Sequence, residues 1–538
     1  MANNIVGFAL ALLPLLVIFV GMVQFKRNAL VMGFVGAGIT AFLAVLYFKT
    51  SWDAVLGACA IGVLKSLGIT LAVAATMLMI FVMKASGALD VVVDWLKKLA
   101  DTPEQQALLF GIGFGSFTTS IGLVTQSLFP PILVAMGFAP LAAVLISVLG
   151  YNALCSYALL GIPITLTADA SQSLIATPFT SPDFAWACAI YLPVISVGLS
   201  LSMVLVVGGM QSLRKGWLAA LVAGLVLSGS TLLLLKLGTP VEIVGIIASV
   251  LCMLAMVGYQ RIAHGKRDLA PERQANHKMS LLRALSPWII IVLVGLVISI
   301  PKVKLWLSDA LGIATSHEII KRGIDVVTVY GINIDLNVLS QIYTWIFIVT
   351  LVSMPILGLN LRQVAHTFGL WAKRTWKPAA SSAIYFAIAY MMCYSAYAIQ
   401  SGQFTKIDGF ADWNINSIVG SVVAGTGALY PLLAPLLGLF GAVVAGSETS
   451  SNIMFLQIQS TAASKLGLDS QFLTIFGGHA IAGGVASAIT PAKINNAVNT
   501  IAAESHLESA AMKRLIWICL ALAAATGIMS FVFVALGV

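Results

Sequence analysis

Long uncharged apolar runs recur along this chain, and they constrain its fold more strongly than any other feature. An α-helix needs about 20 mostly apolar residues to cross the hydrocarbon core of a bilayer. Many runs reach that length, while charged residues make up only 9% of the 538 residues. A soluble domain carries about 25% charged residues, so this chain could not cover itself with water-compatible surface. The predicted fold class is an all-α polytopic membrane protein.

Basic residues predict the topology because they concentrate in cytoplasmic loops. They lie in clusters between the apolar runs, for example Lys26-Arg27, Arg214-Lys215 and the cluster from Arg261 to Arg283. If all clusters lie inside, both chain ends lie outside, which requires about 12 transmembrane helices plus broken or re-entrant segments. The net charge of +9 is explained by these loops and does not indicate a nucleic-acid partner. We expect a multi-pass membrane protein.

The six cysteines are scattered singly through apolar segments, without a CxxC pair or a Cys/His cluster. Neither a disulfide framework nor a metal site is therefore expected. The sequence also lacks the HExxH and GxSxG patterns, so we do not expect an enzyme. No cofactor is predicted, and a proton or sodium gradient would be the energy source.

Two long polar connections divide the chain. Residues 259–285 form a polar, basic linker that we expect on the cytoplasmic side. Residues 302–339 form a mixed amphipathic segment that is too polar to span and is expected outside. We therefore predict an N-terminal transmembrane half, 1–258, and a C-terminal transmembrane half, 286–538.

An internal repeat supports these two halves. The first copy lies in 111–165 and the second in 438–495, and each has a hydroxyl-rich break, an apolar helix and a second break that ends at proline. Pro163 matches Pro491, 328 residues later, and matching glycines lie at offsets of 326 and 330. Such repeats are typical of transporters whose inverted halves place broken helices at the substrate site. We therefore predict two inverted structural repeats.

The hydroxyl-rich break of the second copy reads GSETSSN. Glycine permits a helix to break, and backbone groups freed at this depth must line a cavity or be buried in protein. The helix that restarts presents free N–H groups, which suit a carboxylate. The alternative is that the hydroxyls only join helices. The predicted substrate-binding residues here are Ser447, Thr449, Ser450, Ser451 and Asn452.

Glu448, in the same break, is the strongest single candidate. Ionisable groups inside membranes are rare because they are costly to bury. Water-poor surroundings favour the neutral form of a carboxyl, which suits reversible protonation. We predict that Glu448 carries a coupling proton or helps to hold a sodium ion, with a purely structural carboxyl as the alternative. His479 is a second candidate for ion coupling, although a lone membrane histidine can also be a hydrogen-bonded packing residue.

Two further groups complete the candidate site, and Lys65 is not part of it. The second break of the second copy, SAITPAKINN, contributes Thr490 and Lys493, whose ammonium could pair with an anionic substrate or extend to the interface. Lys65 is expected near the outer end of its helix, with its ammonium at the interface. The uncharged break of the first copy, TTSIGLVTQS, contributes the predicted substrate-binding residues Thr118, Thr119, Ser120 and Gln126.

With these breaks, the chain resembles the bacterial L-lactate permease family, whose members carry lactate and glycolate with protons. The resemblance is strongest in GLFGAVVAGSETSSNIMFLQIQSTAASKLGL. VMKASGALDVV, TPEQQALLFGIGFGSF, GFAPLAA and ALLGIPI are also similar, and these blocks cover nearly the whole chain in order. Thr119 stands where the family has a glutamate, and His479 and Lys493 replace smaller polar residues. The resemblance implies the fold, the transporter class and a location in a bacterial inner membrane.

We therefore expect a secondary active transporter for small monocarboxylates such as L-lactate or glycolate, working as a proton symporter by alternating access. One alternative is a sodium-coupled transporter of another small organic anion, which the uncharged first break favours. Another is a passive anion channel, which needs no titratable group. The expected partners are a small carboxylate and the lipid bilayer, and homo-oligomerisation is left open.

Overall fold

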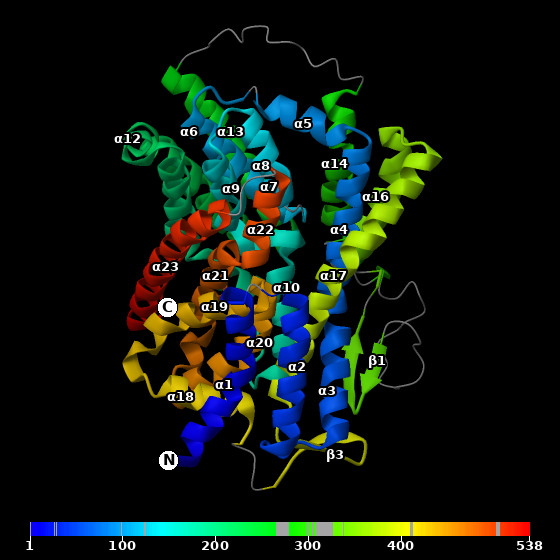
Figure 1. The fold of residues 1–538 in the computed structure, drawn as a ribbon, viewed down its shortest axis with the longest axis vertical. Helices are drawn as coiled ribbons and strands as arrows, with labels where there is room; N and C mark the ends of the chain where they lie inside the picture. Colours follow the sequence, from blue (N-terminus) through cyan, green and yellow to red (C-terminus); the bar gives the residue numbers. More distant parts are fainter. Residues whose placement is uncertain are drawn as a thin grey trace.

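The computed structural model describes residues 2–25, 27, 29–97, 99–122, 125–264, 279–298, 300, 302–303, 306–307, 326–336, 338–339, 341–408, 413–501 and 506–538. Its elements are almost all helices, and many of them run roughly along the long axis of the molecule (Figure 1). The linker residues 265–278 and residues 308–325 of the predicted outward segment lie outside the described residues.

Among its described residues, the first half of the chain forms thirteen α-helices and two short segments of other helix types. In order these are α1 (Ala2–Val23), α2 (Ala29–Leu46), α3 (Trp52–Lys65), α4 (Leu67–Ala85), α5 (Ala88–Lys97), α6 (Pro103–Leu108), the π-helical η1 (Leu109–Phe114), α7 (Gly115–Ser120), α8 (Thr125–Ala135), α9 (Pro140–Leu149), the 3-10 helical η2 (Gly150–Tyr157), α10 (Ala158–Leu174), α11 (Ser181–Ala189), α12 (Leu192–Lys236) and α13 (Val241–His264).

The second half contains helices and two small antiparallel hairpins. In order these are α14 (Leu281–Ile298), β1 (Val326–Val329), β2 (Ile332–Asp335), α16 (Ile342–Leu357), α17 (Leu361–Cys393), β3 (Tyr397–Gln400), β4 (Gln403–Lys406), α18 (Ile415–Ala424), η3 (Gly427–Leu429), α19 (Tyr430–Ala445), α20 (Glu448–Lys465), η4 (Asp469–Gln471), α21 (Phe472–Ala486), η5 (Ser487–Ile489), α22 (Pro491–Thr500) and α23 (His506–Ala535). In the first hairpin Val326 pairs with Asp335, and in the second Tyr397 pairs with Lys406.

Nine helical stretches among the described residues are long and apolar enough to cross a membrane. Three shorter apolar helices accompany them, at Leu30–Leu46, Ile342–Leu357 and Ile415–Ala424. The stretch Leu192–Lys236 is 45 residues long and bends at Gly208 and Gly209, so it is not one straight span. The prediction of an all-α polytopic membrane protein is confirmed, and the number of crossings stays a prediction.

One long stretch, Trp52–Ala85, joins α3 and α4 with only Ser66 between them. Lys65 therefore lies near the middle of 34 residues of helix and not near an end. The structure pairs the Lys65 ammonium with Asp169 of α10, and the depth of this ammonium in the membrane stays a prediction.

The helix breaks in the two halves lie where the sequence predicts them. In the first half the chain turns after α7, at Gly122, and is irregular again through η2 to the start of α10. In the second half it turns at Gly446, between α19 and α20, and again at η5. Whether the two copies superpose about a two-fold axis in the membrane plane stays a prediction.

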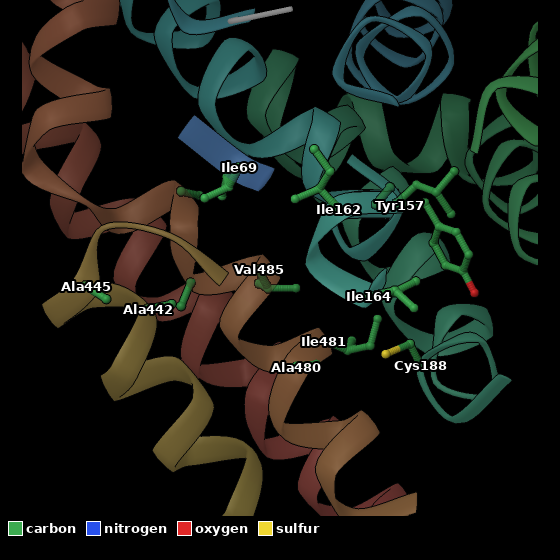
Figure 2. Close-up of a cluster of buried hydrophobic side chains, with 14 of the residues drawn as sticks. Ile69, Tyr157, Ile162, Ile164, Cys188, Ala442, Ala445, Ala480, Ile481 and Val485 are labelled. Atoms are coloured by element: carbon green, nitrogen blue, oxygen red, sulfur yellow. The ribbon is translucent and has the colours of Figure 1, made fainter. Parts of the chain in front are cut away.

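The broken segments of the two halves contact each other directly. Ser156 of η2 bonds to Glu448 at the start of α20, 292 residues away. Asn152 of η2 bonds to Ser487 of η5, 335 residues away. Around them the core is apolar: Figure 2 shows Ile162 of α10 together with Ile481 and Val485 of α21. Polar breaks are thus enclosed by apolar helices.

The two ends of the molecule differ in what they carry. Figure 1 shows α5, α6 and the linker-side ends of α13 and α14 at one end, and the hairpins of β1 and β3 toward the other. The hairpins touch through Tyr330 and Phe404, whose ring centroids are 5.9 Å apart. Which end faces the cytoplasm stays a prediction.

Candidate functional site

The tip between α19 and α20 places the GSETSSN stretch inside the protein. Gly446 ends α19 with a left-handed backbone (φ 75°, ψ 0°), a conformation that costs other residues more. Ser447 then caps α20, because its hydroxyl accepts a hydrogen bond from the Ser450 backbone N–H at 3.2 Å. Glu448 is thus the first residue of a helix whose N-terminus lies in the interior.

The Glu448 side chain is only 3% exposed. The Ser156 hydroxyl donates a hydrogen bond of 2.5 Å to Glu448 Oε1. Oε2, on the other side of the carboxyl, is buried without a hydrogen-bond partner. The side chains of Cys155 and Asn452 also interact with this carboxyl, and the positive charge of Lys493 attracts it. Half of the carboxyl is therefore held, and half is open to a proton, an ion or a ligand.

Gly484 of α21 makes room for this carboxyl. A Cβ atom at Gly484 would lie 2.6 Å from Glu448 Oε2 and 3.0 Å from the Cβ of Cys155. Such distances are too short for ordinary contact, so only glycine fits without displacing a neighbour. The site is thus built from three elements: the start of α20, η2 and α21.

Asn452 lies one helical turn beyond Glu448 on α20. It is fully buried and lies close enough to interact with the Glu448 carboxyl, but neither its amide nitrogen nor its carbonyl oxygen makes a hydrogen bond of ordinary geometry. A buried amide without ordinary hydrogen bonds costs free energy, so the Asn452 amide is suited to hydrogen-bond a ligand. Thr449, Ser450 and Ser451 are buried beside it. The predicted binding residues of this break therefore do lie together.

The second break of the second copy joins this site. The Ser487 hydroxyl donates to Asn152 Oδ1 at 2.9 Å and lies 3.2 Å from the Tyr151 hydroxyl. The Thr490 hydroxyl donates back to the Ser487 carbonyl at 2.9 Å. Lys493 Nζ lies 5.8 Å from the centre of the Tyr151 ring, within the range of a cation–π contact. Lys493 therefore supplies a cation to the edge of the site.

The hydroxyls of α7 lie beside the site rather than in it. Thr118 donates to the carbonyl of Phe114 at 2.8 Å, a bond within its own helix. Ser116, Thr119 and Ser120 are buried with unpartnered hydroxyls. Ser120 packs against Gly245 of α13, where a Cβ would be 2.5 Å from its oxygen and 3.0 Å from the Cβ of Tyr157.

Gln126, on α8 beyond the first break, is buried. Ser120 and Tyr157 both lie next to Gly245, and Tyr157 follows Ser156 in the chain. The first break is therefore near the Glu448 carboxyl through Tyr157. No direct contact between α7 and Glu448 is seen among the described residues.

His479 lies in a separate hydrogen-bonded network. Gln459 Nε2 donates to His479 Nδ1 at 3.0 Å, so the neutral ring carries its proton on Nε2, which lies 3.4 Å from the Ser451 hydroxyl. Tyr430 donates to the Gln459 side-chain oxygen. These contacts tie α19, α20 and α21 together. His479 is linked to the Glu448 site through Ser451, and its role in ion coupling stays a prediction.

Several residues of the site were not singled out from the sequence. They lie in the stretch YNALCSY and at the C-terminal end of α21 and the start of η5. Their polar atoms or small size complete the Glu448 environment: Tyr151, Asn152, Cys155, Ser156, Gly484 and Ser487. The signal available was a polar run between two apolar helices. The described residues contain no cluster of three or more His, Cys, Asp or Glu that could hold a metal.

Broken helices that meet around buried polar groups, inside a bundle of membrane-spanning helices, define a class. The chain is a multi-pass membrane transport protein. Comparison with known protein families identifies the family within this class: the family described as L-lactate permease matches residues 7–537. The chain belongs to the L-lactate permease family.

Its similar relatives are distant in sequence but match over most of their length. An L-lactate permease of Streptococcus iniae is 23% identical over 86% of this chain and 92% of its own. The glycolate permease GlcA of Escherichia coli (strain K12) is 24% identical over 86% and 84%. An L-lactate permease of Halalkalibacterium halodurans is 24% identical over 94% and 92%. These relatives are permeases, not enzymes.

Proposed function

We propose that this protein is a permease for small monocarboxylates such as L-lactate or glycolate, and that it works as a proton symporter by alternating access. The observation that carries the proposal is the half-satisfied Glu448 carboxyl beside the Asn452 amide, which makes no hydrogen bond of ordinary geometry. The similar lactate and glycolate permeases supply the substrate class.

The chemistry of the site fits a small hydroxy acid. The start of α20 offers backbone N–H groups and a positive helix end to a carboxylate. Asn452 offers a donor and an acceptor, which suit a carboxylate oxygen and a neighbouring hydroxyl. Lys493 supplies positive charge nearby. In this proposal Glu448 takes up the coupling proton, which removes a negative charge next to the bound anion.

A second candidate is sodium coupling. The unpartnered hydroxyls of Ser116, Thr119 and Ser120 favour it, because neutral oxygen atoms are suitable ligands for a sodium ion. A passive anion channel is the third alternative. It predicts no dependence of accumulation on either gradient.

Uptake of radiolabelled L-lactate and glycolate into proteoliposomes tests the substrate class. Counterflow exchange, with unlabelled substrate inside, should be saturable and competed by other small 2-hydroxy acids. The Asn452→Ala variant should raise the KM for exchange about tenfold, as expected for lost hydrogen bonds to a charged group. Wild-type protein that exchanges neither anion would refute the proposed substrates.

A further inference from the structure

A cavity of about 510 Å³ lies beside the irregular start of α10. Its walls come from the junction of α3 and α4, from α10, from the first residues of α13 and α16, and from β2. Leu160, which lines it, has a left-handed backbone and lies four residues after Ser156. The cavity therefore adjoins the break that holds Glu448, but its lining does not include Glu448.

Lys65 and Asp169 form an ion pair in this cavity. Lys65 Nζ donates to Asp169 Oδ2 at 3.0 Å. The Lys65 side chain is 11% exposed and that of Asp169 is 52% exposed. Water can therefore solvate Asp169 if it leaves the pair, whereas the nearly buried ammonium needs a counter-charge. Another anion can therefore take the place of Asp169, whereas Lys65 always needs an anionic partner.

We propose that Lys65 is a binding site for the carboxylate of an incoming monocarboxylate, which replaces Asp169 as its partner. The substrate class rests on the proposed function above. An external carboxylate can make the same charge-assisted hydrogen bond that Asp169 makes. Because an ion pair with a half-exposed partner contributes little stability, its exchange for a substrate carboxylate is easy.

The remaining polar groups of the cavity fit a small hydroxy acid. Thr165 of α10 and Gln341, the residue before α16, bring a hydroxyl and an amide to the lining. Glu242 is the third charged residue there. It lies in the first turn of α13, where the helix dipole offsets its negative charge. The cavity is large for a three-carbon anion, so the substrate would enter with water around it.

This site would bind the substrate before it reaches Glu448. The two sites are joined through the start of α10, which carries Leu160 in one and follows Ser156 in the other. Lys65 attracts and holds the anion, while Glu448 has the separate task of accepting a proton. The two roles therefore predict different phenotypes.

Two single variants distinguish a binding site from a structural ion pair. Lys65→Gln should raise the KM for L-lactate and glycolate exchange about tenfold, as for the loss of one bond to a charged group. Asp169→Asn should lower it about threefold, because the internal competitor for Lys65 is weakened. Lys373→Gln and Asp90→Asn, the same changes at exposed positions, should leave it unchanged.

A structural ion pair gives a different pattern. Both variants would then impair transport in the same direction, and the double variant would recover part of the loss; that pattern overturns the inference. If Lys65→Gln does not fold, Asp169→Asn alone decides, and an unchanged or raised KM counts against the site.

Thermal unfolding separates this inference from the proposed function. Sodium acetate, compared with sodium chloride at equal ionic strength, should raise the Tm of the wild-type protein by binding the native state. It should raise the Tm of Lys65→Gln less and that of Asp169→Asn more. This pattern in a protein that transports neither lactate nor glycolate would retain the site while the proposed function fails. Transport without any acetate effect on Tm would contradict the site alone.

Discussion

The Glu448 carboxyl is held by few contacts, and each comes from a different part of the chain. Ser156 bonds to one oxygen, and the missing side chain of Gly484 makes room for the other. The sequence indicated that Glu448 would be buried and functional, because a carboxylate inside an apolar run is too costly to keep without a task. It could not indicate Ser156, since a contact across 292 residues depends on tertiary packing.

Gly484 gives a direct test at this scale. Gly484→Ala should place a methyl group 2.6 Å from Glu448 Oε2, so the carboxyl must move and transport should fall at least tenfold. The protein should still fold, because one methyl in a packed core typically costs about 1–3 kcal/mol. Uptake and fluorescence-detected gel filtration measure the two effects.

Gly229→Ala is the matched control, because a Cβ there meets nothing within 4 Å. This variant should transport like the wild-type protein. Full activity of Gly484→Ala would mean that the carboxyl does not depend on its present position.

At the scale of elements, the breaks decide where polar groups can lie. Gly and hydroxyl-rich stretches between apolar runs indicated the breaks at Gly122 and Gly446 correctly, because local chemistry determines them. The ion pair of Lys65 with Asp169 was not predicted, because a lysine in an apolar segment is usually expected to extend its ammonium to the interface. Local composition shows where a helix can break, but not where a charged residue finds a distant partner.

Gly446 should affect stability through its backbone conformation and not through side-chain contacts. Its φ is 75°, and a Cβ there would meet nothing within 4 Å. Gly446→Ala should therefore destabilise the protein by about 1 kcal/mol through backbone conformation alone. Gly446→Asn should cost less, because asparagine tolerates the left-handed region better. Thermal unfolding in detergent compares them, and equal Tm values for alanine and wild type would contradict this account of the tip.

At the scale of the whole molecule, the orientation in the membrane is testable. Ser280, at the end of the linker, and Tyr330, in the first hairpin, are both exposed. In intact cells a membrane-impermeant maleimide should label Tyr330→Cys and not Ser280→Cys. Native cysteines should give little background, since five are buried and Cys59 is partly buried. Labelling of Ser280→Cys alone would reverse the predicted topology.

The predicted inverted repeat also belongs to this scale. The sequence indicated two copies through the order of their features, and the structure brings η2 of one copy against α20 and η5 of the other. An experimental structure should superpose 111–165 on 438–495 after a two-fold rotation about an axis in the membrane plane. Opposite orientations of the copies would let each half open to a different side.

The most direct test of the central claim is gradient-driven accumulation by wild-type protein and by Glu448→Gln in proteoliposomes. Glutamine keeps the shape and can still accept a hydrogen bond from Ser156, but it cannot titrate. An imposed pH gradient should drive accumulation of L-lactate or glycolate by the wild-type protein only. Glu448→Gln should retain counterflow exchange. If Glu448→Gln accumulates substrate to the wild-type level with the same pH dependence, Glu448 does not carry the coupling proton and the account is wrong.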